Sequence, residues 1–599
     1  MASRLTSESE QGIIVPSTPR LAFVIFVLAL MGCGQAVPTV RPLGEDARSL
    51  TSPSGPPKRL VIGQLNVVKA YASWDFANTS GGGPMLAEVH MAGLVSQNAQ
   101  GEREPRLAAR VPSFEEGSLE MLTDGRMRAT WRLRSNLLWH DSMPFTSDDL
   151  VFSREVQRHP DLPSSLGVQR TASAALDRAD GPDPHTFVMT WRAPFFRALD
   201  LGTRDFWPLP KHILNEAFQG DKQAFQTHPY FTTDYVHLGP FRLADFGLGE
   251  EQVFRRFDSY FLGPANLDTI VIRTIRDPNA LLASLLAGAI DMVAETALPS
   301  EAFAQLRDGW MREGHGFLVQ RQFTWRYLYV QFGAQWARPP ELSQDVRARS
   351  GILRALDRDG IREFLFPEYD ADLSSADTFM TRRDPRYDAV GQPFAAYRHD
   401  VRASLADLGQ VGWNRALDGR LLGRDGQQVQ LDLRGGINES KAIPAIADFL
   451  RRIGLDVTES ITNPVQSRDA EYQATFPGLE SNARASGDQI LPNFDGRLQA
   501  LTENRWTLGN RSHYANPALD RLIDRAYAAP DLLNQGVVLR EIGELMAADL
   551  PALPLYFTMA FAAAARDVRA LADDYAATGV PGSGGSGLMS RNAHLWDRS

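Results

Sequence analysis

The chain has 599 residues, of which 43% are hydrophobic and 22% are charged, a balance typical of a folded protein rather than a disordered one. Its net charge of −10 argues against nucleic-acid binding, because no basic stripe gathers to neutralise phosphates. The single cysteine excludes a disulfide framework. The length exceeds what one hydrophobic core supports, so we expect at least two lobes.

An N-terminal apolar run, Leu21–Gly32, lies between Arg20 and Cys33. This arrangement is typical of a secretory signal, and the run is shorter than the about 20 residues that a membrane-spanning helix needs. Its end, LMGC, resembles a bacterial lipobox, in which the cysteine is lipidated. We therefore predict a signal peptide with a lipobox over residues 1–32 and a lipid anchor on Cys33; an ordinary signal peptide is the alternative. Residues 33–58, rich in Pro, Gly and Ser, predict a flexible linker.

Strand and helix patterns alternate along the rest of the chain. A capping box at Thr146 and Asp149 predicts one helix start. Asp277-Pro278 and Asn516-Pro517 predict two more, because Asp or Asn caps free N–H groups and proline fits the first turn. The alternation predicts an α/β fold with a mixed sheet in each half. We predict a further helix over 443–450 and strands over 59–65, 127–133, 185–191, 267–273 and 455–458.

The chain carries no recognisable catalytic or metal-binding motif. It lacks a GxxxxGK[ST] phosphate loop, HExxH, GxSxG, and a GxGxxG placed between a strand and a helix. The 11 histidines are scattered and form no set with metal-ligand spacing. His140 and Asp141 are adjacent, but neighbouring residues on a strand point to opposite faces. We therefore predict no catalytic site, no metal site and no cofactor.

Five segments, taken in chain order, carry a resemblance to a known family. The most specific is residues 133–153, where LR, WHD and PFTSDDLVFS match the pattern LRxGxxWHDGxPFTAxDVVFS. The family is that of the extracellular solute-binding proteins of ABC importers, family 5, the peptide/nickel/oligosaccharide-binding group. The other four segments are Gly239–Leu243 (GPFRL), Asn266–Asp291, Asp345–Arg358 and Tyr514–Tyr556.

The resemblance implies a two-lobed fold of the periplasmic-binding-protein type II class. Lobe I is expected over residues 59–275 and again over 553–599, with the extra subdomain typical of this large group. Lobe II is expected over residues 276–552. Two strands are expected to cross between the lobes and act as a hinge.

The same resemblance implies a receptor rather than an enzyme. The expected function is a lipid-anchored substrate-binding protein that captures a solute, peptide-like or another small polar or oligomeric molecule, and delivers it to ABC permease subunits. The expected place is the periplasmic or cell-surface side of a bacterial membrane, and the expected state is a monomer. The alternatives are an exported lipoprotein hydrolase and a sensory solute-binding lobe that is not coupled to transport.

The sequence departs from the family in the segment that sets ligand specificity. Peptide binders of this group usually carry an aspartate that pairs with the ligand's α-amine, in a stretch like WxADYxDP. The corresponding segment here, residues 475–483, has no aspartate. A buried ammonium without a carboxylate partner is costly, so a free peptide is a less favoured ligand. Glu480 is the candidate substitute, and Ser481 and Asn482 suit a neutral or hydroxylated solute.

Aromatic side chains near the expected hinge and core strands complete the predicted site. Each of the aromatic residues outside the 475–483 segment has lobe-core packing as its alternative role. The predicted ligand-binding residues are Trp74, Phe76, Trp325, Tyr327, Phe476, Glu480, Ser481 and Asn482.

Overall fold

The structure is a computed structural model. Cys33, Trp74 and Phe76, with the predicted signal peptide and the linker up to residue 56, lie outside the residues that it describes. The described residues are 57–65, 86–97, 103–162, 175–203, 206–247, 250–367, 376–382, 384–436, 439–463, 465–485, 487–529, 531–571 and 588–599.

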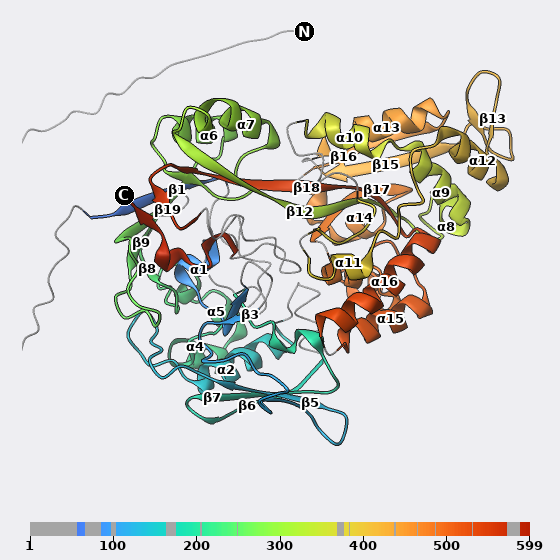
Figure 1. The fold of residues 1–599 in the computed structure, drawn as a ribbon. Coiled ribbons are helices and arrows are strands. Elements are labelled where there is room, and N and C mark those ends of the chain that lie inside the picture. The colour runs from blue at the N-terminus through green and yellow to red at the C-terminus, as the bar shows by residue number, and fades with distance from the viewer. Residues whose placement is uncertain are drawn as a thin grey trace, which may run out of the picture. The chain divides into compact units, whose positions relative to one another are not determined.

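A mixed ten-stranded sheet organises the described chain (Figure 1). Its pairs are antiparallel except β1 with β10 and β11, and β15 with β16 and β17, which are parallel. Its strands in spatial order are β16 (Asp456–Thr462), β15 (Gln430–Gly436), β17 (Leu479–Ala485), β12 (Gly316–Val330), β18 (Ala552–Ala565), β11 (Met292–Val293), β1 (Arg59–Gln64), β10 (Thr269–Thr274), β9 (Glu251–Arg256) and β8 (Phe241–Phe246).

Smaller sheets accompany the large one. The antiparallel four-stranded sheet has the order β4 (Leu119–Met121), β5 (Met127–Arg132), β7 (Thr186–Trp191) and β6 (Leu176–Asp183). The two-stranded sheets are β2 (Val95–Gln97) with β3 (Arg103–Pro105), β13 (Asn414–Arg415) with β14 (Leu421–Leu422), and β19 (Val568–Arg569) with β20 (Asp597–Arg598).

Helices connect and cover the strands. The α-helices are α1 (Ala87–His90), α2 (Ser147–Arg158), α4 (Lys211–Gln219), α5 (Lys222–Gln226), α6 (Pro278–Leu286), α7 (Ser300–Gln305), α8 (Glu341–Gln344), α9 (Val346–Ala355), α10 (Arg358–Leu365), α11 (Tyr387–Val390), α12 (Val401–Val411), α13 (Ala442–Arg452), α14 (Ala470–Ala474), α15 (Pro517–Tyr527) and α16 (Leu532–Asp549). Short turns of helix used below are η3 (Phe196–Leu199), η5 (Leu306–Met311) and η9 (Gly487–Asn493).

The predicted helix starts are confirmed in detail. Asp277 accepts a hydrogen bond from the N–H of Ala280 at 2.7 Å and opens α6, with proline at its first position. Asn516 accepts a hydrogen bond from the N–H of Ala518 at 2.9 Å and opens α15, which also begins with proline. In α2, the carboxylate of Asp149 accepts from the N–H of Thr146 at 3.0 Å. These ends form where the sequence places them because each side chain satisfies a helix N–H that has no partner within the helix.

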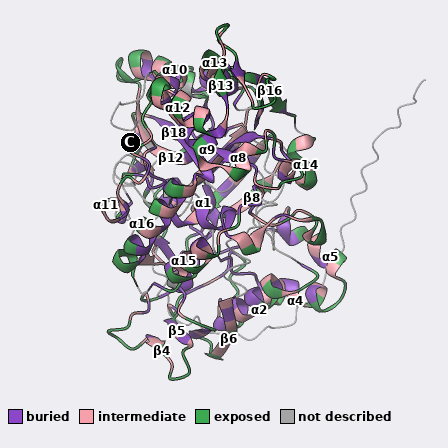
Figure 2. Cartoon of the chain, turned by 90° about the vertical axis from the view of Figure 1, so that its right-hand side faces the viewer, coloured by how far each residue is buried: buried purple, intermediate pink, exposed green. Residues whose placement is uncertain are grey.

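Two long strands, β12 and β18, run side by side from α6 and α7 to the strands β15, β16 and β17 (Figure 1). Their antiparallel register shifts at two points, between Gln322 and Trp325 and again between Arg326 and Tyr327. At the first of these points the hydroxyls of Thr324 and Thr558 are 2.6 Å apart. β18 is buried along most of its length, and Figure 2 shows it among helices whose outer faces are exposed.

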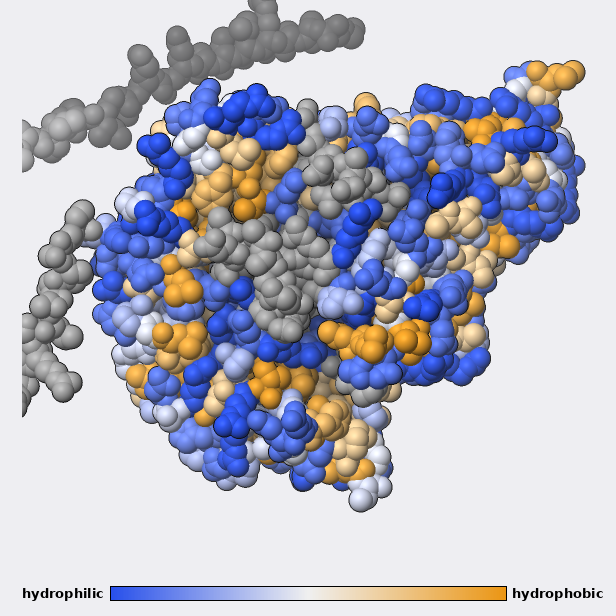
Figure 3. Space-filling view, in the orientation of Figure 1, coloured by the Kyte–Doolittle hydropathy of each residue, from blue (hydrophilic) through white to orange (hydrophobic). Residues whose placement is uncertain are grey.

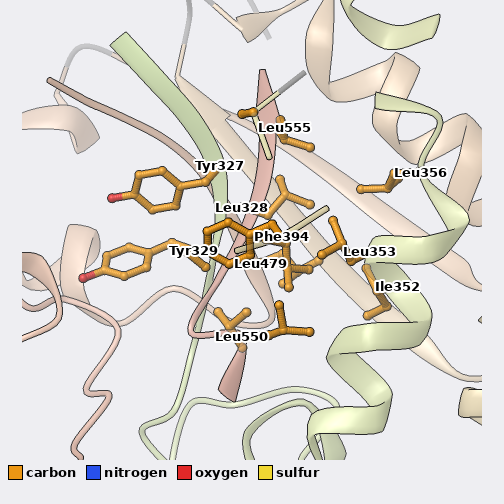
Figure 4. Packing of buried hydrophobic residues seen from close by; sticks show 14 of the residues in the cluster. Tyr327, Leu328, Tyr329, Ile352, Leu353, Leu356, Phe394, Leu479, Leu550 and Leu555 are labelled. Carbon is orange, nitrogen blue, oxygen red and sulfur yellow. The ribbon is translucent and has the colours of Figure 1, made fainter. Parts of the chain in front are cut away.

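Within the described ranges, the buried apolar side chains form three clusters. The first cluster packs around β1, β10 and α6 and includes Phe561 of β18, and the third packs around β5 and β7 and includes Trp131. The second cluster packs around β12, β15, α9 and α13 and includes Trp325. Figure 4 shows part of the second cluster, where Leu328 faces Leu353 of α9. The two ends of β18 therefore belong to different cores.

The predicted boundary between the lobes lies at residue 276, but the segment from α6 to η5, residues 278–311, packs with the first cluster. Side chains of α6, α7 and η5 belong to the first cluster, because β11, which follows α6, pairs directly with β1. We propose that the chain leaves lobe I within β12, near Thr324, and returns to it within β18, near Thr558. The third cluster, with its own four-stranded sheet, would then be the extra subdomain of lobe I.

The described surface is mainly polar on the face drawn in Figure 3, with smaller hydrophobic patches. Among the residues that the structure describes, no helix is both long enough and apolar enough to cross a membrane. On this face, therefore, most apolar side chains lie beneath the surface, in the clusters described above.

Three buried histidines lie close together beside α1 and β8. A 2.7 Å hydrogen bond joins Nδ1 of His90 and the hydroxyl of Tyr235. The backbone N–H of His237 donates to Nδ1 of His140 at 3.1 Å. Burial lowers the pKa of His90 to about 3 and that of His140 to about 4. The folded protein therefore holds these rings neutral at a pH where the unfolded chain protonates them.

This difference predicts an acid-side loss of stability. Between pH 6.5 and about 4 the unfolded state binds more protons, so the free energy of unfolding falls as the pH falls. His140→Asn keeps an acceptor near Nδ1 but cannot titrate, and should lower the slope by up to about 1.4 kcal/mol per pH unit. Urea denaturation at several pH values measures the slope.

The matched control is the exposed His185, where His185→Asn should leave the slope unchanged.

Glu88 changes the stability of the fold in the opposite direction. Burial raises its pKa to about 7, so its contribution to stability falls as the pH rises from 4.5 to 7. The comparison of variants removes this common contribution. Equal slopes for the wild type and His140→Asn would contradict the assignment of a neutral buried ring.

Candidate ligand-binding site

The predicted site residues that the structure describes gather on β12, on β17 and in the turn before β17. The two strands are antiparallel, and opposed residues share a sheet face. The opposed pairs on one face, which we call the tyrosine face, are Trp325 with Arg484, Tyr327 with Asn482, and Tyr329 with Glu480.

Ser481 and Phe476 occupy different places from the rest of the predicted set. Ser481 opposes Leu328, so it lies on the other face of the sheet. Phe476 precedes β17 and stacks on Tyr329 with ring centroids 6.0 Å apart. The structure thus brings together Trp325, Tyr327, Glu480 and Asn482 on the tyrosine face and adds Phe476 at its edge.

The aromatic side chains of the tyrosine face are fully buried in the second cluster. Ring centroids of Trp325 and Tyr327 are 4.4 Å apart, and Phe494 lies 5.9 Å from Tyr327. In Figure 4, Tyr327 and Tyr329 point in the same direction, away from the α9 side chains. These rings pack as a core does, and their contact with a ligand stays a prediction.

Glu480 already has a cationic partner. Its carboxylate accepts a hydrogen bond from the guanidinium of Arg434 at 3.1 Å, and both side chains are buried. Arg434 reaches this position because β15 runs parallel to β17 and places Arg434 beside Glu480. A ligand α-amine would therefore have to compete with a buried arginine for this carboxylate.

Several buried polar atoms on these two strands lack a hydrogen-bond partner. Within the described part of the chain they are Oε1 of Gln320, Nε1 of Trp325, Nε of Arg326, Oη of Tyr327, Oε2 of Glu480 and Oγ of Ser481. Each such atom costs about 1–3 kcal/mol when it stays unpaired. Unpartnered buried atoms also occur in the other cores of the described chain, for example Nε1 of Trp131, Trp191 and Trp596, so these atoms alone assign no role to the region.

The sequence reasoning missed two arginines at this place. Arg484 lies on the tyrosine face two residues after Asn482, so the alternation of β17 could have indicated it. Arg511 comes from a distant loop, yet its charge is close enough to influence the pKa of Arg484. No local pattern in the sequence pointed to Arg511.

A buried ion-pair network joins the second and third clusters. Arg197 of η3 donates to one oxygen of Asp488 in η9 at 3.2 Å, and Arg386 donates to the other at 2.8 Å. Burial alone would raise the pKa of Asp488, but the two guanidinium groups outweigh it and hold the pKa below its usual value. Close by, the rings of Phe195 and Tyr527 are 6.3 Å apart.

A second ion pair joins the first and second clusters at the surface. Lys441, next to α13, contacts Glu301 of α7, and both side chains are exposed. Within the described ranges, no group of three or more His, Cys, Asp or Glu side chains is arranged to hold a metal ion. The polar groups at the candidate site are therefore arginines, amides, hydroxyls and one neutralised carboxylate.

Similarity to known proteins identifies the family of this chain. A family model for the bacterial extracellular solute-binding proteins, family 5, matches residues 103–494. The oligopeptide-binding protein AppA of Bacillus subtilis is 22% identical over 442 residues, which cover 72% of this chain and 76% of that protein.

Two solved structures are similar in fold. NikZ from Campylobacter jejuni, in complex with Ni(L-His), has a TM-score of 0.70 at 18% identity and covers 91% of this chain and 100% of its own. An oligopeptide-binding protein from Thermus thermophilus, complexed with a pentapeptide, has a TM-score of 0.69 at 20% identity and covers 90% and 96%.

The predicted fold class is confirmed by these similarities and by the topology: a mixed α/β, two-lobed binding-protein fold in which two strands cross. Proteins of the matched family are transport binding proteins, not enzymes, and they act outside the cytoplasm. The match covers well over half of the chain, and the chain belongs to the bacterial extracellular solute-binding proteins of family 5.

Proposed function

We propose that the chain is a lipid-anchored substrate-binding protein of an ABC importer, which captures a solute between two lobes and delivers it to permease subunits. The observation that carries the proposal is that one strand, β12, holds both the crossing point and the candidate site. Thr324 lies at the crossing, Trp325 is the next residue, and Tyr327 is three residues after Thr324. A solute that contacts this strand and the opposite lobe binds the closed state better and shifts the population toward it.

The ion pair between Arg197 and Asp488 supports the same proposal. It connects two separate cores by a contact that does not depend on the crossing strands. We take this pair to be a closing contact, made when the lobes come together around the solute. Both side chains are buried, so the contact is shielded from the solvent screening that weakens surface pairs.

The solute in this proposal is peptide-like or another small polar or oligomeric molecule. The similar proteins are described as binding an oligopeptide, a pentapeptide or a nickel–histidine complex. This range supports a receptor whose specificity is set by individual side chains rather than by the fold. The protein would act as a monomer on the periplasmic or cell-surface side of the membrane and release its ligand unchanged.

The transported solute is expected to raise the melting temperature, because a ligand that binds only the folded state adds RT ln(1 + [L]/Kd) to its stability. Native mass spectrometry of protein purified without denaturation can identify a retained ligand. A thermal-shift screen of peptides, N-acetylated peptides and neutral solutes then ranks candidates. Scattering with a stabilising solute should give a smaller radius of gyration, and chemical conversion of that solute would contradict a transport receptor.

Arg197→Gln tests the closing contact. It removes the partner from the third cluster but leaves Asp488 paired with Arg386. The closed state should become less populated, so we expect solute affinity to fall by about tenfold and the ligand-free radius of gyration to stay the same or grow. Calorimetry and scattering measure the two effects.

The matched control for this variant is Arg103→Gln. Arg103 pairs with Asp200, which also contacts Arg197, but it does not reach Asp488. It should leave solute affinity within about twofold. Equal losses of affinity in both variants would mean that Arg197 acts by stabilising its own subdomain.

Cys33→Ser tests the lipid anchor. The variant should remain unprocessed or be released, and the mature protein should no longer partition into detergent. Gln35→Ser, two residues further along, is the control and should partition like the wild type. Detergent partitioning that persists in Cys33→Ser would leave only an ordinary signal peptide as the explanation of the N-terminal run.

A further inference from the structure

Arg484, on the tyrosine face, is held by neutral acceptors wherever the structure describes its contacts. Its Nη1 donates to the side-chain oxygen of Asn482 at 2.8 Å and to the carbonyl of Ala483 at 2.9 Å. Its Nε faces the amide of Asn493. These contacts fix the direction of the guanidinium without neutralising its charge.

Arg511 adds a second positive charge beside the first. Its guanidinium donates to the side-chain oxygen of Gln473, another neutral acceptor. Burial first, and then the charge of Arg511, lower the pKa of Arg484. Among the described residues, no carboxylate forms an ion pair with Arg484 or Arg511, whereas Arg434 pairs with Glu480 and Arg326 with Glu439.

Two partly buried positive charges side by side, with no ion-pair partner among the described residues, are costly through desolvation and mutual repulsion. A guanidinium does not lose its proton under ordinary conditions, so the pair cannot relieve the repulsion by neutralisation. Both side chains keep partial access to solvent, unlike the buried Arg434. An anion that enters from that side would supply the missing charge.

The rest of the tyrosine face fits an oxygen-rich, negatively charged group. Nε1 of Trp325 and the hydroxyl of Tyr327 are buried and have no partner among the described residues, and both can donate a hydrogen bond. Glu480, the one carboxylate of this face, is neutralised by Arg434. The face therefore presents donors and net positive charge, which is the reverse of what a ligand ammonium group needs.

We propose that Arg484, with Arg511 beside it, forms a subsite for a carboxylate group of the captured solute. The proposal rests on the proposed receptor function and names the class of its ligand: an organic acid or a peptide-like molecule bound through a carboxylate rather than through an amine. The planar guanidinium matches a carboxylate with two parallel N–H bonds, which gives both strength and direction.

Matched acids and amides test the subsite. The probes are citrate, an N-acetylated tripeptide with a free carboxylate, the same tripeptide as its C-terminal amide, and inorganic phosphate, each titrated calorimetrically into the full chain. The acids should bind at least tenfold more tightly than the amide. Arg484→Gln should weaken acid binding at least tenfold and change amide binding little.

The matched control is Arg420→Gln, which removes the same charge from an exposed residue that pairs with Asp418. It should bind the acids as the wild type does. If phosphate binds and neither acid does, the carboxylate assignment is overturned. If a neutral solute binds and neither acid nor phosphate does, the subsite is wrong while the receptor function stands.

The stability of the ligand-free protein gives a readout that needs no ligand. Gln can still donate to Asn482, and its introduction removes the repulsion with Arg511, so Arg484→Gln should keep or raise the melting temperature. Arg434→Gln should lower it, because it leaves Glu480 buried and unpaired. An equal fall in both variants would show that Arg484 is structural and would overturn the proposal.

Discussion

The antiparallel pairing of β12 with β18 is the constraint on which the rest of the structure depends. One ladder runs from Gly316 opposite Ala565 to Tyr329 opposite Ala552, and its two ends are packed in different hydrophobic clusters. Each cluster holds its own part of the ladder rigidly. The first of two register shifts follows Gln322, where two threonine hydroxyls meet at the boundary between the two clusters. On our proposal, bending between the two lobes concentrates there, a few residues from the tyrosine face.

Asp488, a buried carboxylate next to the second cluster, has two arginine partners, and on the closing-contact proposal this pairing would let the lobes separate without loss of folding. Asp488 binds Arg386 within its own lobe and Arg197 from the third cluster. When the lobes part, Asp488 keeps Arg386, and Arg197 keeps Asp200. Neither side is left with a buried, unpaired charge, whose cost is about 3–5 kcal/mol. On this proposal, the contact forms and breaks as the protein binds and releases its solute.

Local signals in the sequence were sufficient for the helices and strands but not for the site. The caps at Asp277 and Asn516 depend on residues within one turn, so the starts of α6 and α15 could be predicted. The placement of α6 with the first cluster could not, because it follows from pairing β1 with β11 across more than two hundred residues. The partner of Glu480 was hidden for the same reason, since a parallel register brings Arg434 to it.

The absence of an aspartate from residues 475–483 takes on a different meaning once the arginines are considered. From the sequence, that absence suggests a neutral solute and leaves Glu480 as a replacement for the aspartate. In the structure, Glu480 is neutralised by Arg434, and Arg484 on the same face has no ion-pair partner among the described residues. A site with this balance disfavours an ammonium by repulsion as well as by the lack of a partner. On our proposal, the chain keeps the family's hinge and lobes and reverses the sign of the group by which its ligand is recognised.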